Sequence, residues 1–210
     1  MHERAHRGGL RERKRVSAMR HIQQVAIDLF DERGFDAVTI EAVAAAAEVS
    51  PSSVYRYFGT KEGLVVRDDA DRTLVASFAA HLVEHDVWDA VDLAIEDADP
   101  AGFEPVAALH LARMRLFHDV PSVRGRLLVE AADAIDELAG VLMSPTAKVP
   151  RSRFEARVVA TALVGALVVA AQEWYAAGGA APILDLARTS IDLVRTDRQA
   201  GRGDRPGQGS

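Results

Sequence analysis

The chain has 210 residues, of which 49% are hydrophobic and 27% are charged, and it contains no cysteine. These proportions are typical of a globular protein, and they exclude a disulfide scaffold, a thiolate metal site and a cysteine nucleophile. The net charge of −6 is unevenly spread, because residues 1–67 carry 11 basic and 9 acidic side chains whereas the remainder is strongly acidic. A basic N-terminal third either binds a polyanion or is a solvated segment, and charge alone leaves both readings open.

Targeting signals are not evident in the sequence. The N-terminus is basic but has no apolar run behind it, so a secretory signal is not predicted. The longest apolar stretch, residues 158–171, is interrupted only by Thr161 and is shorter than the roughly 18–20 residues that a transmembrane helix needs. We therefore expect a buried or interface helix there, no membrane segment and a cytoplasmic protein.

The N-terminal elements are three short helices after a polar arm. Residues 1–14 are expected to be a basic flexible arm, and apolar residues at helical spacing predict a helix over residues 17–33 that ends at Gly34. Thr39 is a suitable cap for a second helix over residues 40–47. Ser50 followed by Pro51 predicts the start of a third helix over residues 51–58. Residues 15–60 thus form a small helical domain.

The rest of the chain is expected to form longer helices in a second domain over residues 61–196. The predicted helices cover residues 61–85, 87–97, 103–118, 121–143, 151–177 and 182–195, followed by a disordered tail at residues 197–210. The fold class is therefore all-α with about nine helices.

The second and third helices have the spacing of a helix-turn-helix, which by itself is a weak signal for DNA binding, because all-α domains make such crossings for packing. The third helix adds a stronger signal, because it concentrates hydroxyl, phenol and guanidinium groups: Ser52, Ser53, Tyr55, Arg56 and Tyr57, with Lys61 shortly after. A helix in the major groove of DNA uses such groups for phosphates and guanine edges. The pattern favours a DNA-binding helix.

The stretch from His21 to Leu64 resembles the N-terminal domain of TetR-family transcriptional regulators. The matching positions are Ala26, Leu29, Phe30, Gly34, Phe35, Thr39, Val43, Ala44, Ala47, Val49, Ser50, Val54, Tyr55, Tyr57, Phe58, Lys61, Glu62 and Leu64. Glu48 departs from the pattern, since it replaces the glycine that is common before the Val49 position. The C-terminal part resembles actinobacterial members with acyl-CoA-type ligand-binding domains.

The resemblance implies roles for individual residues in binding double-stranded DNA. Thr39, Tyr55, Tyr57 and Lys61 match positions that contact the DNA backbone, and Arg56 is the expected reader of base edges. The complete set of DNA-binding candidates is Thr39, Ser50, Ser52, Ser53, Tyr55, Arg56, Tyr57 and Lys61. Val54, Phe58, Ala47 and Phe35 are assigned to the core. The basic residues up to Arg20 either clamp flanking phosphates or remain solvated.

The resemblance also implies a homodimer on a palindromic operator, with the last two long helices forming the interface. The sequence agrees, because residues 158–171 are apolar nearly all round and such a helix must be covered on both sides. The interface candidates are Val158, Ala162, Gly165, Ala166, Val169, Ile183, Leu186 and Ile191.

The resemblance further implies a small-molecule effector, hydrophobic or similar to acyl-CoA, in the second domain. The candidate ligand-binding residues are Phe78, Trp88, His110, Arg113, Met114, Phe117 and Trp174. Arg113 lies in an apolar stripe, so it either pairs with an acidic residue such as Glu130 or Asp133, or meets an anionic ligand. His81 and His85 have metal-ligand spacing but lack a third ligand, so we expect no metal and no cofactor.

Three functions compete at this stage. The first is a ligand-gated transcriptional regulator, most often a repressor, in which the helix over residues 61–85 couples effector to DNA. The second is an enzyme, which we do not expect, because no Glu-x-x-His pair falls on the helices predicted for a bundle, and the sequence has no G-x-S-x-G, H-E-x-x-H or Walker motif. The third is a helical adaptor that has lost DNA binding.

Overall fold

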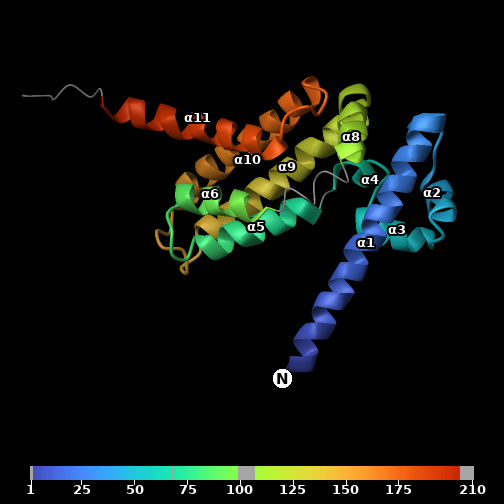
Figure 1. The fold of residues 1–210 in the computed structure, drawn as a ribbon, viewed down its shortest axis with the longest axis horizontal. Coiled ribbons are helices and arrows are strands. Elements are labelled where there is room, and N and C mark those ends of the chain that lie inside the picture. The colour runs from blue at the N-terminus through green and yellow to red at the C-terminus, as the bar shows by residue number, and fades with distance from the viewer. Residues whose placement is uncertain (1, 68, 99–106, 204–210) are drawn as a thin grey trace, which may run out of the picture. The chain divides into compact units, whose positions relative to one another are not determined.

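The computed structural model describes residues 2–67, 69–98 and 107–203, and within these ranges every regular element is a helix. Ten helices are defined there: α1 (His2–Arg33), α2 (Ile40–Ala46), α3 (Pro51–Phe58), α4 (Gly63–Val66), α5 (Asp69–His81), α6 (Val87–Asp97), α8 (Ala107–Asp119), α9 (Pro121–Leu142), α10 (Arg153–Ala176) and α11 (Ile183–Gly203) (Figure 1). The expected all-α class is confirmed, with ten helices rather than about nine.

The chain divides into two compact units. The first comprises residues 1–69 and 108–130, and the second comprises residues 70–107 and 131–210. The sequence predicted a single boundary near residue 60. The structure differs, because α8 and the first half of α9 belong to the same unit as the helix-turn-helix. This grouping depends on contacts between residues far apart in sequence, which helical periodicity does not reveal.

Three predicted helix boundaries are wrong. The segment 1–14 was expected to be a flexible arm, but α1 begins at His2, as its many strong helix formers allow. The helix predicted over residues 61–85 is broken at Arg67, whose extended backbone (ψ 133°) ends α4. The expected disordered tail is helical from residue 197 to Gly203, while residues 204–210 and 103–106 lie outside the described residues.

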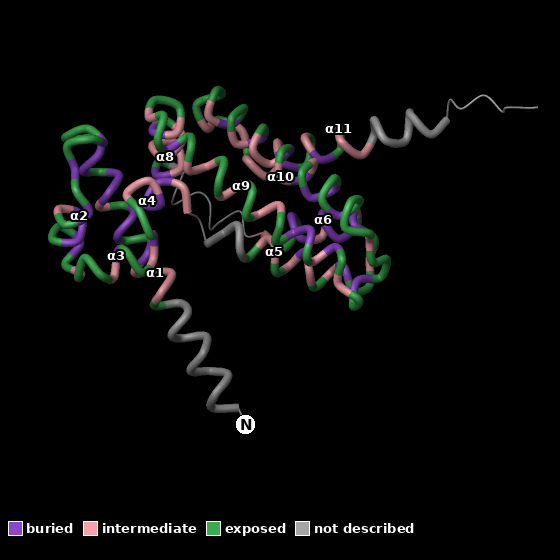
Figure 2. The backbone as a smooth tube through the Cα atoms, turned by 180° about the vertical axis from the view of Figure 1, so that it is seen from behind, coloured by how far each residue is buried: buried purple, intermediate pink, exposed green. Residues whose placement is uncertain are grey.

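The core of the first unit lies where α1, α2, α3 and α4 meet. The rings of Phe30 and Phe35 pack with centroids 4.8 Å apart, and Val54 and Phe58 of α3 are fully buried. Figure 2 shows this burial concentrated on the sides of α1, α2 and α3 that face one another. The core residues predicted from the sequence, Phe35, Ala47, Val54 and Phe58, are thereby confirmed.

The second unit is built around α6, α10 and α11, with contributions from α5 and the second half of α9. The helix α10 begins with a capping box, in which Ser152 and Glu155 satisfy each other's backbone N–H groups. One face of α10 is buried against the core, through Ala156, Val159, Ala160, Leu163, Ala166, Ala170 and Trp174. One guanidinium nitrogen of Arg195 donates to both carboxylate oxygens of Asp92, which fixes α11 to α6 and raises the pKa of Arg195 above its usual value.

The opposite face of α10 is apolar but exposed. Among the described residues, α10 is the one helix that is long and apolar enough to span a membrane, with a mean hydropathy of 1.8 over an 18-residue window. The sequence led us to expect an apolar segment too short to span a membrane. By length and composition alone, α10 as a whole is long enough. A core or interface helix passes the same test, and 33% of the window is buried within the protomer.

Candidate nucleic-acid interface

The helix-turn-helix is held by short local hydrogen bonds at the starts of its two helices. The hydroxyl of Thr39 accepts a hydrogen bond of 3.1 Å from the N–H of Ala42, which caps α2. The hydroxyl of Ser50 accepts from the N–H of Ser53 at 3.2 Å and caps α3, with Pro51 in the first turn. Each cap fixes the first turn of a helix, as the sequence predicted.

The turn between α2 and α3 contains a strained residue. Glu48 has a φ of 55°, in the left-handed region that glycine adopts without a side-chain penalty. Among the described residues it is the only non-glycine residue with a positive φ. This is the position at which the sequence departs from the glycine of the family pattern. The structure therefore places a carboxylate side chain, at a conformational cost, in the turn that sets the angle between the two helices.

The helix α3 separates its residues into a buried face and an exposed polar face. Val54 and Phe58 are 0% exposed, whereas Tyr55 is 48% exposed and Arg56 is also exposed. The guanidinium of Arg56 donates to the phenol oxygen of Tyr57 at 3.1 Å and lies 4.7 Å from the centre of that ring. The guanidinium group itself is planar, and in this exposed position it is suited to bidentate contact with a guanine edge or with a phosphate.

The hydroxyls at the start of α3 form a compact cluster on the same surface. The oxygen of Ser50 lies 2.9 Å from the oxygens of both Ser52 and Ser53. Ser50 and Ser52 are exposed and Ser53 is half-buried. Three hydroxyls at the positive end of a helix form a surface on which a phosphate oxygen would be stabilised.

Lys61 has an additional structural role that the sequence did not predict. Its ammonium donates to the carbonyl oxygens of Phe35 at 2.8 Å and Val38 at 3.1 Å, and it lies 4.4 Å from the centre of the Phe35 ring. An ammonium group has three donors, so these two bonds leave one for a further acceptor. Lys61 thus ties the loop before α2 to the segment after α3.

Gly63 explains how α4 can approach α3 so closely. A Cβ atom at this position would lie 2.0 Å from the carbonyl oxygen of Phe58, well inside van der Waals contact. Sequence reasoning missed this position, although a glycine opening a helix was a signal that could have been noted. The backbone contact fixes the end of α3 against the start of α4.

The C-terminal turn of α4 receives side chains from distant helices. Gln23 of α1, which is 6% exposed, donates to the carbonyl oxygens of Leu64 at 3.2 Å and Arg67 at 2.7 Å. Arg113 of α8 donates to the carbonyls of Val65, Val66 and Arg67. Carbonyls at a helix end lack intrahelical partners, so these donors satisfy groups that would otherwise be costly to bury.

Arg67 connects this turn to α3 and α9. Its guanidinium donates to the carbonyl oxygen of Tyr57 at 2.7 Å and to a carboxylate oxygen of Glu130 at 3.4 Å. Arg126, one turn earlier on α9, pairs with the same carboxylate oxygen. The sequence raised Glu130 as a partner for Arg113, but the contacts seen for Glu130 are to these two other arginines.

The candidate ligand-binding residues are divided between the two units. His110, Arg113, Met114 and Phe117 belong to the first unit, and Phe78, Trp88 and Trp174 to the second. Phe78 and Trp174 are each 3% exposed, and the indole N–H of Trp174 donates to the carbonyl of Ala181 at 2.9 Å. The guanidinium of Arg195 lies 5.7 Å from the ring of Trp88. These contacts give Phe78 and Trp174 roles in the core.

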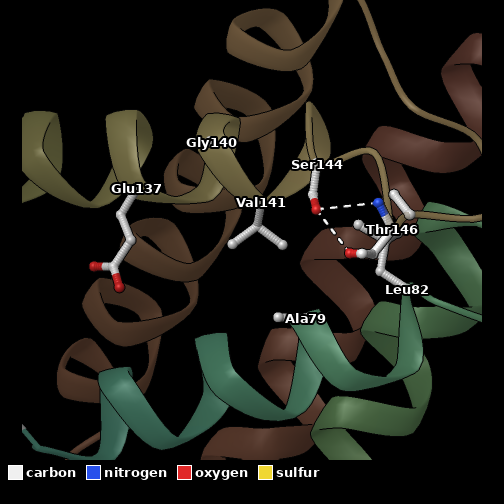
Figure 3. Close-up of a pocket in the computed structure, with 8 residues that line it drawn as sticks. Ala79, Leu82, Glu137, Gly140, Val141, Ser144 and Thr146 are labelled. Atoms are coloured by element: carbon white, nitrogen blue, oxygen red, sulfur yellow. Dashed lines mark hydrogen bonds between the residues drawn. The ribbon is translucent and has the colours of Figure 1, made fainter.

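A cavity of about 360 Å³ lies in the second unit between α5 and the end of α9. Its lining residues are Ala79, Leu82, Glu137, Gly140, Val141, Ser144, Thr146 and Ala147, and none of the seven candidates is among them. Figure 3 shows Val141 of α9 opposite Ala79 of α5, with the hydroxyl of Ser144 hydrogen-bonded to Thr146 at one end. The lining is mainly apolar and carries a single carboxylate, Glu137.

His81, the last residue of α5, makes a polar contact with α6. His81 Nε2 lies 2.7 Å from a carboxylate oxygen of Asp97, and the hydroxyl of Ser77 donates to the same oxygen at 2.6 Å. The hydrogen bonds from Ser77 and His81 hold the pKa of Asp97 below its usual value. Within the described residues, no group of three or more potential ligands is placed to hold a metal ion.

The interface candidates on α10 and α11 also separate by burial. Val158 is 53% exposed, Val169 is 50% exposed and Gly165 is exposed, whereas Ala166 and Ile191 are 7% and 1% exposed and belong to the protomer's core. Ala162, Ile183 and Leu186 are half-buried. Phe154, one turn before Val158, is 78% exposed and was missed, although its apolar side chain at helical spacing was a usable signal.

Comparison with known proteins assigns two family models to the chain, and the second of them includes α8 and all of α9. Residues 22–67 match the sequence model of bacterial regulatory proteins of the tetR family, and residues 85–199 match that of the MftR C-terminal domain. The transcriptional regulator TcmR of Streptomyces glaucescens is 24% identical over 176 residues, which cover 80% of this chain and 77% of TcmR. The transcriptional repressor Rv3405c of Mycobacterium tuberculosis is 50% identical over 44 residues, or 21% of this chain and 23% of the repressor.

A solved structure shares the fold. FadR of Thermus thermophilus, a TetR-family repressor crystallised with lauroyl-CoA, aligns with a TM-score of 0.54 at 20% identity, covering 91% of this chain and 98% of FadR. At this identity the likeness concerns the fold alone.

Proposed function

The chain belongs to the TetR family of DNA-binding transcriptional regulators, and we propose that it is a repressor that binds a palindromic operator as a homodimer. The proposal rests mainly on the division of α3 into a buried apolar face and an exposed polar face. Any surface helix exposes a polar face, but that of α3 concentrates the hydroxyl, phenol and guanidinium groups that bind DNA: Ser52, Ser53, Tyr55, Arg56 and Tyr57. The adaptor alternative is disfavoured, because each candidate DNA-binding side chain remains on the surface or partly accessible.

On this proposal the contacts with DNA divide into two kinds. Arg56 reads a base edge, since it is exposed and its guanidinium can bond a guanine in bidentate fashion. Thr39, Tyr55, Tyr57, the serine cluster and the third donor of Lys61 contact phosphates. The basic stretch before the matched domain, which includes Arg20 and continues α1 toward His2, extends the contact to flanking phosphates.

The homodimer is proposed to form through the exposed face of α10. Val158, Gly165 and Val169 lie at helical spacing on that face, and Phe154 extends it. Ile183 and Leu186 of α11 contribute, whereas the buried Ala166 and Ile191 do not. An apolar face of this extent is stable in water only when it is covered, and two-fold pairing matches a palindromic operator.

An effector is proposed to bind in the second unit, in the cavity between α5 and α9. Its volume is within the range of small-molecule sites, and its apolar lining suits a hydrophobic ligand. The carboxylate of Glu137 disfavours the phosphates of an acyl-CoA at that point of the cavity. The acyl chain of such a ligand, or an uncharged hydrophobic molecule, therefore fits this lining better than a polyanionic head group.

The operator is tested by selecting the full-length protein's preferred DNA from a library of random duplexes. We expect an inverted repeat to be enriched, and Arg56→Ala to lose about 10–100-fold in affinity for it, as one bidentate base contact is worth 1–3 kcal/mol. Arg124→Ala removes an exposed cation from α9 and serves as the control. A library without an enriched sequence would contradict the proposal.

The dimer is tested by sedimentation of Val158→Glu. We expect dissociation to monomers, because a buried unpaired carboxylate costs several kcal/mol. Leu128→Glu alters a leucine on α9 that is 69% exposed, against 53% for Val158, and is expected to remain dimeric. If both variants sediment as the wild type does, the interface lies elsewhere.

A further inference from the structure

Four helices of the first unit converge on one turn, the C-terminal turn of α4. The carbonyls of residues 64–67 receive hydrogen bonds from Gln23 of α1 and Arg113 of α8. The side chain of Arg67, the residue that directly follows α4, donates to the carbonyl oxygen of Tyr57 in α3 and pairs with the carboxylate of Glu130 in α9. We call residues 64–67 with these donors the α4 junction. Except for the bond from Arg67 to Tyr57, which spans 10 positions, its contacts link residues 41 to 63 positions apart in sequence.

The contact of the junction with α3 involves the end of the recognition helix. Arg67 donates to the carbonyl of Tyr57, which is one of the last carbonyls of α3 and has no partner within the helix. The phenol oxygen of Tyr57 also accepts a hydrogen bond from the guanidinium of Arg56. The orientation of Arg67 is therefore coupled to the two residues that the proposed function assigns to DNA.

Two side chains outside the helix-turn-helix control this arrangement. Arg113 bonds three successive carbonyls at the end of α4, which fixes the position of the turn that carries Arg67. Glu130 accepts from Arg67 and is 25% exposed, while Arg67 itself is 40% exposed. Arg126 holds the carboxylate of Glu130 from the preceding turn of α9.

We propose that Arg113 and Glu130 are positioning residues for operator recognition, which act on α3 through α4 and Arg67. This inference rests on the proposed function and assigns to α8 and α9 a part in binding DNA without contact with it. Arg113, which the sequence suggested as a ligand-binding residue, instead donates hydrogen bonds to the carbonyls at the end of α4. Because α9 continues from Glu130 into the second unit as one helix, a change in that unit has a covalent route to the junction.

The alternative role for both residues is simple stabilisation of the unit. A stabilising contact would lower the melting temperature when removed, but it would leave DNA affinity unchanged at temperatures where the variant is fully folded. A positioning contact lowers the affinity for the operator under those conditions. Affinity for a scrambled duplex, which depends on charge, would change little.

The test measures binding of the selected operator and of a scrambled duplex by full-length Arg113→Met, Glu130→Gln and Arg124→Met, well below their melting temperatures. Arg124→Met is the matched control, because it removes a cation from the same unit and Arg124 bonds the local carbonyl of His118. We expect Arg113→Met and Glu130→Gln to lose about 3–30-fold in operator affinity, within the usual range for indirect coupling. Both should keep the wild-type affinity for the scrambled duplex.

Hydrogen exchange supplies a second readout. In Arg113→Met we expect faster exchange of the amides of α3 and of the turn that follows it, with those of α2 unchanged. Arg113→Lys should restore part of the operator affinity, since an ammonium can bond one or two of the three carbonyls. If Arg113→Met does not fold, the nearly isosteric Glu130→Gln decides the question.

The outcomes separate the two proposals. If the wild type binds no duplex selectively, the proposed function fails irrespective of the junction. If the wild type binds selectively and both junction variants match Arg124→Met, the positioning role is wrong. A fall in melting temperature without a fall in operator affinity also overturns it.

Discussion

The recognition helix α3 and the α4 junction belong to one compact unit but are held by different kinds of contact. The side-chain hydrogen bonds at the start of α3 and between Arg56 and Tyr57 join residues one to three positions apart. Those of the junction join residues up to 63 positions apart. Residues on the exposed surface of α3 can therefore be substituted without loss of the fold. Substitutions in the junction disturb the contacts of α4 with α1, α3, α8 and α9 at once.

The strongest test of this difference is Gly63→Ala. Its Cβ would meet the carbonyl oxygen of Phe58 at 2.0 Å, and neither backbone can yield without moving α3 or α4. We expect the free energy of unfolding to fall by about 3 kcal/mol, measured by denaturant titration, which is the upper end of the usual cost of overpacking, because the clash is with backbone.

The matched control for this substitution is Gly125→Ala. Gly125 lies within α9, and a Cβ there meets nothing within 4 Å. Alanine should stabilise the helix by about 0.5–1 kcal/mol, as it does at unhindered helical positions. Equal effects of the two substitutions would show that the contact between Phe58 and Gly63 does not constrain the fold.

A medium effect is expected at Thr39, where two roles can be separated. Thr39→Ala removes the cap of α2 and should cost about 1 kcal/mol in stability, measured by thermal unfolding. Thr39→Asp keeps the capping oxygen, so its stability should remain near that of the wild type. Its negative charge should nevertheless weaken operator binding through repulsion from a phosphate. Unchanged DNA binding by Thr39→Asp would argue against a phosphate contact.

The smallest effect is expected in the turn at Glu48. Its φ of 55° is strained for glutamate and acceptable for glycine, so Glu48→Gly should stabilise the unit by up to about 1 kcal/mol. The gain is limited because glycine also increases the entropy of the unfolded chain. Loss of stability in this variant would indicate that the carboxylate of Glu48 makes a favourable interaction that offsets its strain.

The sequence predicted the local features well for a physical reason. Caps such as Thr39 and Ser50, the terminating Gly34 and the apolar spacing of α1 act within one or two helical turns, and each was read from neighbouring residues. The division of α3 into Val54 and Phe58 inside and Arg56 outside follows from the same short-range periodicity.

The features that the sequence did not reveal depend on distant partners. Arg113 was recognised as unusual in an apolar stripe, but its carbonyl partners are 46 to 48 positions away in the chain. The break at Arg67 was hidden because the helix signal resumes at once in α5, although the acidic pair at residues 68 and 69 is typical of a helix start. The function was predicted from the resemblance to a family, whereas the α4 junction became visible only in the structure.

The central claim is that α3 reads a specific DNA sequence, and the most direct test is a salt titration. The affinity of the full-length protein is measured for DNA upstream of its own gene and for a scrambled duplex of equal length. The account predicts tighter binding to the upstream DNA, a linear fall of log affinity with log salt, and loss of the preference in Arg56→Ala. Equal affinity for the upstream and scrambled duplexes at every salt concentration would contradict it, provided that the duplexes selected from the random library are also bound no more tightly than the scrambled one.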